Sequence, residues 1–298
     1  MGTVPDAEPD LCRDVRRHCA AVAASARQVT ITSTARTYTP GVAGLDPGVH
    51  LLDASPEDRA RYVLIMDAIN FGSGWFHLLD HDGDEDLTTT ISRRLSEHAR
   101  RRGQVWTPAE LRILDAAAVA RVLGQDPAHE LMRLYAQALR DLGSWLGDRA
   151  ALNVIADARG SARTFARQAA IAMPFFEDPG FYKRAQIAAN DLVLAGVAEF
   201  EDIDELTVFA DNILPHALRL DGILVYDAAL AAQIDAGQRI AAGSRAEQEI
   251  RACAVHACEQ IARRQGVAPR VLDNWLWNLG QGARYTRTPA HRTQTVAY

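Results

Sequence analysis

Lysine is almost absent from this sequence. Of the 32 lysine and arginine residues among its 298, one is lysine, Lys183, and the others are all arginine. A lysine ammonium group is a compact charge on a flexible stem, and it fits where a planar guanidinium does not. Because arginine supplies almost every other cation of this chain, Lys183 is a candidate functional residue.

Other absences exclude whole classes of function. The sequence has no apolar run of about 18 residues, which a membrane-spanning helix would need. The net charge is −6 and no basic tract stands out, which argues against a nucleic-acid partner. The first residues lack the basic and apolar regions of a signal peptide. We therefore expect a cytoplasmic protein with no nucleic-acid partner and no membrane partner; the sequence does not indicate an oligomeric state.

Cysteine is scarce, and its spacing does not favour a metal site. Cys12 and Cys19 are seven residues apart, and Cys253 and Cys258 are five apart with His256 between them. Three ligands on one helix would be poor geometry for zinc. No glycine-rich phosphate loop with its lysine is present either. We expect buried, free cysteines and neither a metal ion nor a cofactor.

Hydrophobic periodicity predicts helices nearly throughout the chain. Apolar residues recur at three- and four-residue spacing over 109–124, 128–147 and 243–264. Ser244 and Glu247 have the spacing of a capping box at the start of the last of these helices. The one extended stretch, 28–39, is short enough to be a connection.

These patterns predict an all-α protein made of one large helical domain. The domain is expected to span residues 11–280, with two helical lobes and a cleft between them. Residues 1–10 and the tail 281–298 are expected to be mobile ends.

Two charged residues stand out in the second half of the chain. On a helix, Lys183 shares one face with Gln186 and Asn190. Asp211 lies in an apolar run four residues before Pro215. It is either the N-cap of the helix that follows or a buried acid of a functional site.

Acids also occur next to large aromatic residues in two other segments. Asp67 and Asn70 are one turn apart in an apolar helix, followed by Phe71, Trp75 and Phe76. Asp273 similarly precedes Trp275 and Trp277. Such aromatic residues are either core residues or a wall that stacks on a flat ring.

Five segments, in order, resemble the motifs of the queuosine salvage protein family. They read AINFGSGWF, FYKRAQIAANDL, FADNILPHALRLDGIL, EIRACAVHACE and LDNWLW, and they extend over residues 56 to 280. The residues after Asp211, NILPHAL, depart from the pattern of some members. Because of this departure, no role is transferred from the family pattern to Asn212 or Ile213.

The resemblance implies a fold like that of helix-hairpin-helix DNA glycosylases and a hydrolase activity. Such an enzyme would cleave the N-glycosidic bond of queuosine 5′-monophosphate, releasing queuine and ribose 5-phosphate. Asp211 would act near C1′ of the ribose, as a general base or an electrostatic stabiliser. Lys183 would either hold the 5′-phosphate or contact the ribose and position Asp211.

The substrate-binding residues that the resemblance implies are acids, an amide and aromatic residues. Carboxylates would contact the guanine-like edge and the amine of the substrate, and aromatic rings would enclose the base. The candidates are Asn70, Phe71, Trp75, Asp67, Glu249, Asp273 and Trp275.

Two other interpretations remain open at this stage. The first is a DNA-glycosylase-like enzyme acting on another base or nucleotide, which would need a basic groove for the duplex. The second is a non-catalytic helical binding scaffold whose acids and aromatic residues serve only as caps and core.

Overall fold

The computed structural model describes residues 10–41, 44–81 and 86–298. Helices dominate these ranges, which confirms the all-α prediction. The α-helices are α1 Leu11–Ser25, α2 Pro56–Ala68, α3 Leu87–Arg102, α4 Pro108–Leu111, α5 Ala116–Leu123, α6 Glu130–Leu146, α7 Ala151–Ala156, α8 Ala162–Ala172, α9 Lys183–Leu194, α10 Ile213–Leu220, α11 Ala228–Asp235, α12 Arg245–Gln265, α13 Pro269–Gly280 and α14 Ala283–Thr286. The short 3-10 helices are η1 Phe76–Leu78, η2 Pro174–Phe176 and η3 Ile203–Glu205.

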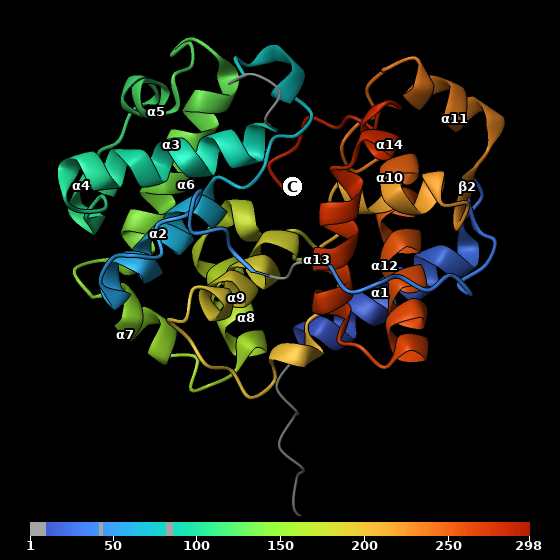
Figure 1. Ribbon diagram of the computed structural model, residues 1–298, viewed down its shortest axis with the longest axis horizontal. Helices are drawn as coiled ribbons and strands as arrows, with labels where there is room; N and C mark the ends of the chain where they lie inside the picture. Colours follow the sequence, from blue (N-terminus) through green and yellow to red (C-terminus); the bar gives the residue numbers. More distant parts are fainter. Residues whose placement is uncertain (1–9, 42–43, 82–85) are drawn as a thin grey trace, which may run out of the picture.

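The helices form two groups that lie side by side (Figure 1). The first contains α2 to α9, in which α9 packs against α2 and α8. The second contains α1 and α10 to α14, in which the long helix α12 packs along α1. Strands β1 Val29–Ile31 and β2 Leu224–Tyr226 pair antiparallel in the second group. The predicted extended stretch 28–39 is therefore a strand only over its first part.

Helix starts follow the capping residues of the sequence. Ser244 caps α12 by accepting a hydrogen bond from the backbone N–H of Glu247, while the Glu247 carboxylate accepts from the N–H of Gly243. Only the serine half of the predicted capping box therefore has its expected partner. The helix predicted over 109–124 is wrong as a single element: Asp115 caps a new helix, α5, and so divides it from α4.

All four cysteines are buried and free, as predicted. Their side chains fill the interface of α1 with α12 and its neighbours as small hydrophobic groups. Within the described ranges, no helix is both long and apolar enough to cross a membrane.

The expectation of a mobile C-terminal tail is wrong. Figure 1 shows the end of the chain between the two groups of helices. His291, Thr293 and Tyr298 are buried, and the main-chain oxygen of Tyr298 accepts a hydrogen bond of 2.9 Å from the N–H of Gly72. Single side chains anchor this segment, and they produce no periodic pattern that sequence analysis could detect. The predicted flexible end, 1–10, lies outside the described residues except for Asp10, which caps α1.

Candidate active site

A cavity of about 410 Å³ lies between the two groups of helices. The first group contributes the end of α2, the start of α3 and one face of α9. The second contributes the segment 209–213 and one face of α13. Its polar and aromatic lining includes Asn70, Phe71, Phe76, Lys183, Asn190, Asp191, Asp211, Asp273, Trp277 and Tyr298. The cavity thus brings together Lys183, Asp211, Asp273, Asn70 and Phe71, five of the residues predicted from the sequence.

Lys183 is the first residue of α9, and its side chain is buried. Its Nζ donates to the carbonyl oxygen of Asn70 at 3.4 Å and to Asn70 Oδ1 at 3.3 Å. Burial lowers the pKa of Lys183, and the carboxylate of Asp211 is the largest influence in the opposite direction. Among the described residues that line the cavity, Lys183 is the one lysine or arginine.

Asp211 lies both at the start of α10 and at the cavity. Its Oδ1 accepts hydrogen bonds from the N–H groups of Ile213 (2.8 Å) and Leu214 (2.9 Å), so it caps the start of α10. The same side chain lines the cavity. Burial raises the pKa of Asp211, while the charge of Lys183 and the two N–H groups counteract that rise.

Asp273 and Asp191 are the other acids near the lysine. Asp273 Oδ1 accepts a hydrogen bond of 2.8 Å from the N–H of Phe209. Burial, and then the charge of Asp211, raise the pKa of Asp273 well above its ordinary value. Burial likewise raises the pKa of Asp191 to about 6. Sequence analysis missed Asp191, although its spacing of eight residues from Lys183 places both on one face of α9.

Asp67 is fully buried behind the cavity wall and does not line the cavity. Among the described residues, neither of its carboxylate oxygens has a hydrogen-bond partner. Burial, followed by the charge of Asp191, raises the pKa of Asp67 well above its ordinary value. Its position does not support direct contact with a ligand in the cavity.

Of the three aromatic residues predicted for the site, one lies at the cavity. Phe71 lines the cavity, but the Arg184 guanidinium lies 4.5 Å from its ring centroid, which leaves at most the other face for a ligand. Trp75 is buried outside the lining. On α13 the structure places Trp277, not Trp275, at the cavity. Trp277 is one helical turn after Asp273, whereas Trp275 is half a turn away from both.

Glu249 is not part of the cavity lining. It is buried on α12, where its Oε2 accepts hydrogen bonds from the N–H groups of Arg27 and Gln28 at 2.9 and 2.7 Å. Oε2 also accepts from the N–H of Val29, and Oε1 pairs with Arg245 at 2.6 Å. The prediction that Glu249 contacts the base does not agree with this position: its carboxylate holds the start of β1.

The exchange Glu249→Gln should lower stability and leave catalysis unchanged. The glutamine amide would replace one acceptor by a donor facing backbone N–H groups, at a cost of about 1–3 kcal/mol. Thermal unfolding should show a lower midpoint, while kcat of the folded protein stays at the wild-type value. A loss of kcat without a loss of stability would instead show that Glu249 belongs to the active site.

The geometry defines an all-α protein with a cavity in which one lysine lies among several carboxyl groups. Burial raises the pKa of Asp191, Asp211 and Asp273, and the charge of Lys183 counteracts that rise. Carboxyl groups whose pKa values are perturbed in this way are suited to proton transfer. Within the described part of the chain, no three histidine, cysteine or carboxylate side chains cluster as a metal site would require.

The chain belongs to the queuosine salvage protein family, whose sequence model matches residues 49–298. The match includes the C-terminal segment 281–298. A relative from Sphaerobacter thermophilus, named queuosine 5′-phosphate N-glycosylase/hydrolase, is 33% identical over 269 residues, which cover 81% of this chain and 82% of the relative. Relatives with the same name from Dictyostelium discoideum and Mus musculus are 36% and 35% identical, and each match covers 40% of both chains.

Proposed function

We propose that this protein hydrolyses the N-glycosidic bond of queuosine 5′-phosphate and releases the base queuine for salvage. The name shared by its relatives supports the substrate. The observation that carries the proposal is that Lys183 and Asp211 lie in one cavity, where burial perturbs the pKa of both. Perturbed ionisable groups in a cavity are characteristic of catalytic sites.

In the proposed reaction, water attacks C1′ of the ribose as the bond from C1′ to the base nitrogen breaks. The Asp211 carboxylate lies near C1′, stabilises the positive charge that develops on the ribose and accepts the proton of the attacking water. The bonding electrons go to the base. Asp273, a second carboxyl group at the cavity whose pKa is raised by burial, donates a proton to the leaving base. A new C1′–O bond thus replaces the C1′–N bond, and one proton moves at each carboxyl group.

The cavity offers complementary groups for the rest of the substrate. Lys183 is the counter-charge for the 5′-phosphate, as the one lysine or arginine among the described lining residues. Trp277 and Phe76 are aromatic lining residues suited to contact the flat base. Asn70 holds the lysine in the cavity through its two oxygen atoms.

The direct test is to incubate the purified protein with queuosine 5′-phosphate and measure free queuine by mass spectrometry. Release of queuine together with ribose 5-phosphate supports the proposal. The matched control is guanosine 5′-phosphate, whose base lacks the side chain of queuine. Release of base from neither nucleotide would contradict the proposed reaction, and equal rates for both would contradict the proposed substrate.

The plot of rate against pH should be bell-shaped. The bell should be narrower than the one expected for an aspartate and a lysine with ordinary pKa values. Asp211 must be ionised, and because its pKa is raised, activity should begin to fall at a higher pH on the acid side. On the basic side, activity requires both the proton of Asp273 and the charge of Lys183, and because the pKa of Lys183 is lowered, activity should fall at a lower pH than an ordinary lysine would give. Measuring kcat from about pH 4 to pH 10 tests both limbs. If the two limbs of the pH profile lay at the ordinary pKa values of aspartate and lysine, these assignments would be contradicted.

A further inference from the structure

The last residues of the chain connect the two groups of helices across the cavity. We call residues 291–298 the closing segment. At one end, the main-chain oxygen of Arg292 accepts a hydrogen bond of 2.8 Å from the N–H of Ile240, in the second group. At the other end, Tyr298 accepts from the N–H of Gly72, just after α2 in the first group. The side chain of Tyr298 is buried and lines the cavity between these anchors.

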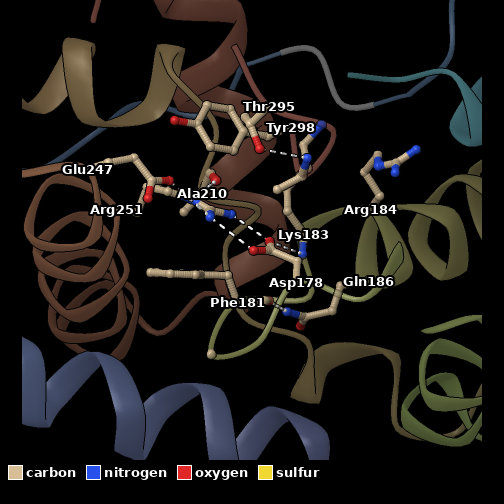
Figure 2. Close-up of polar contacts among 12 residues, drawn as sticks. Asp178, Phe181, Lys183, Arg184, Gln186, Ala210, Glu247, Arg251, Thr295 and Tyr298 are labelled. Carbon is tan, nitrogen blue, oxygen red and sulfur yellow. Dashed lines mark hydrogen bonds and ion pairs between the residues drawn. The ribbon is translucent and has the colours of Figure 1, made fainter. Parts of the chain in front are cut away.

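The ring of Tyr298 stacks on a buried arginine. The guanidinium carbon of Arg251 lies 4.4 Å from the ring centroid of Tyr298 and 3.9 Å from that of Phe181. Figure 2 shows the guanidinium between the two rings. Arg251 is almost completely buried, so its position depends on these rings and on its charged partners.

Arg251 in turn connects to the catalytic lysine through one carboxylate. Its two terminal nitrogens donate to the carboxylate oxygens of Asp178 at 3.0 and 2.6 Å. Asp178 Oδ2 also accepts a hydrogen bond of 3.3 Å from the backbone N–H of Lys183, at the first turn of α9. Dashed lines in Figure 2 mark these contacts. Arg251 Nε also donates to the carbonyl oxygen of Ala210 at 3.1 Å, immediately before Asp211.

We propose that Tyr298 is a positioning residue that acts by stacking on Arg251. Arg251 in turn fixes Asp178 and the carbonyl group of Ala210. These two contacts hold the backbone that carries Lys183 and Asp211. The closing segment thereby completes the active site as well as covering it. A residue at the end of the chain thus sets the spacing of two groups that are 28 positions apart in the sequence and lie on different groups of helices. Small displacements of such groups have large effects on rate.

The lone lysine gives this proposal a test that does not depend on the substrate. In protein made with isotope-labelled lysine, the side-chain NMR signal comes from Lys183 alone. In Tyr298→Leu, water should enter beside the lysine, and because burial is the main cause of its lowered pKa, that pKa should rise toward the ordinary value. Tyr298→Phe keeps the ring and should keep the wild-type signal and pKa.

The kinetic arm of the test rests on the proposed function. Tyr298→Leu should lower kcat for queuosine 5′-phosphate by about 10- to 100-fold with little change in KM, and Tyr298→Phe should restore it. A rise in KM alone would make Tyr298 a binding residue and would overturn the proposal. An unchanged lysine signal in folded Tyr298→Leu would overturn it too, whether or not the wild-type protein hydrolyses this nucleotide.

A second variant moves the closing segment without altering any lining residue. A Cβ atom at Gly74 would overlap the carbonyl group of Thr293 and would lie 2.8 Å from the backbone nitrogen of Gln294. Gly74→Ala should therefore shift the segment and reproduce the effects of Tyr298→Leu on the lysine signal and on kcat. Gly41→Ala is the matched control, because its Cβ would make only ordinary contacts of 3.6 Å with Trp275. A wild-type lysine signal in Gly74→Ala would contradict the role of the segment.

Discussion

Replacing Asp211 by asparagine should lower kcat by about 10³-fold or more and leave the protein folded. The loss removes both the acceptor for the proton of water and the negative charge that stabilises the ribose cation. The asparagine oxygen can still accept the hydrogen bonds that Asp211 Oδ1 receives from Ile213 and Leu214. The measurement is kcat for queuosine 5′-phosphate, together with the midpoint of thermal unfolding.

The control for this prediction is another aspartate with the same capping role. Asp227 accepts a hydrogen bond of 2.8 Å from the N–H of Leu230 and caps α11, outside the cavity lining. Asp227→Asn should therefore leave kcat unchanged. The unfolding midpoint of Asp211→Asn should stay close to that of the wild type, because the neutral amide avoids the cost of a buried carboxylate but loses the interaction with the charge of Lys183. If Asp211→Asn retained kcat within tenfold, Asp211 would be a helix cap alone.

The sequence predicted the charged centre of the site better than its walls. Lys183 was identifiable because the composition is so biased, whereas the position of Asp211 in an apolar run before a proline was a weak signal that the family resemblance strengthened. Both observations concern single residues and need no three-dimensional information. Family motifs then connected them with Asn70 and Asp273, and the structure brings all four to one cavity.

The aromatic walls could not be chosen from sequence neighbours. Trp275 and Trp277 both follow Asp273 closely, and only the helical rotation of α13 determines which of them faces the cavity. Trp277 lies one helical turn after Asp273 and is therefore on the same face of α13. The choice required knowing which side of α13 packs against α10, a contact between elements of separate motifs.

The errors for Glu249 and the C-terminal segment have a common physical origin. Buried charges need partners, and those partners are often backbone N–H groups of distant segments. Glu249 meets this need at residues 27–29 of the chain, and Arg251 meets it at Asp178. Local sequence patterns do not predict either of these two long-range contacts. A segment such as 291–298 therefore has no local sequence pattern that predicts its order, although its last side chain is among the most buried.

Lys183→Arg should lower kcat by about 10- to 100-fold although the charge is retained, and Lys183→Met should lower it by about 10³-fold. The ammonium group of this buried side chain donates to both oxygen atoms of Asn70, and a larger, planar guanidinium would not reproduce both contacts. The methionine side chain has a similar length and no charge, so it separates the effect of charge from the effect of shape. In Lys183→Arg the basic limb of the pH profile should also move to higher pH, because arginine keeps its proton there.

A surface arginine provides the control for the Lys183→Arg prediction. Arg133 lies on the surface of α6, where its side chain is 68% exposed, and Arg133→Lys should leave kcat and the unfolding midpoint unchanged. Arginine and lysine would then be interchangeable on the surface and not in the cavity. If Lys183→Arg matched the wild type in kcat and KM, its charge alone would suffice, and the single lysine of this protein would have no chemical explanation. A loss confined to KM would assign Lys183 to binding the phosphate group alone. A loss in kcat means that its position relative to Asp211 matters in the transition state.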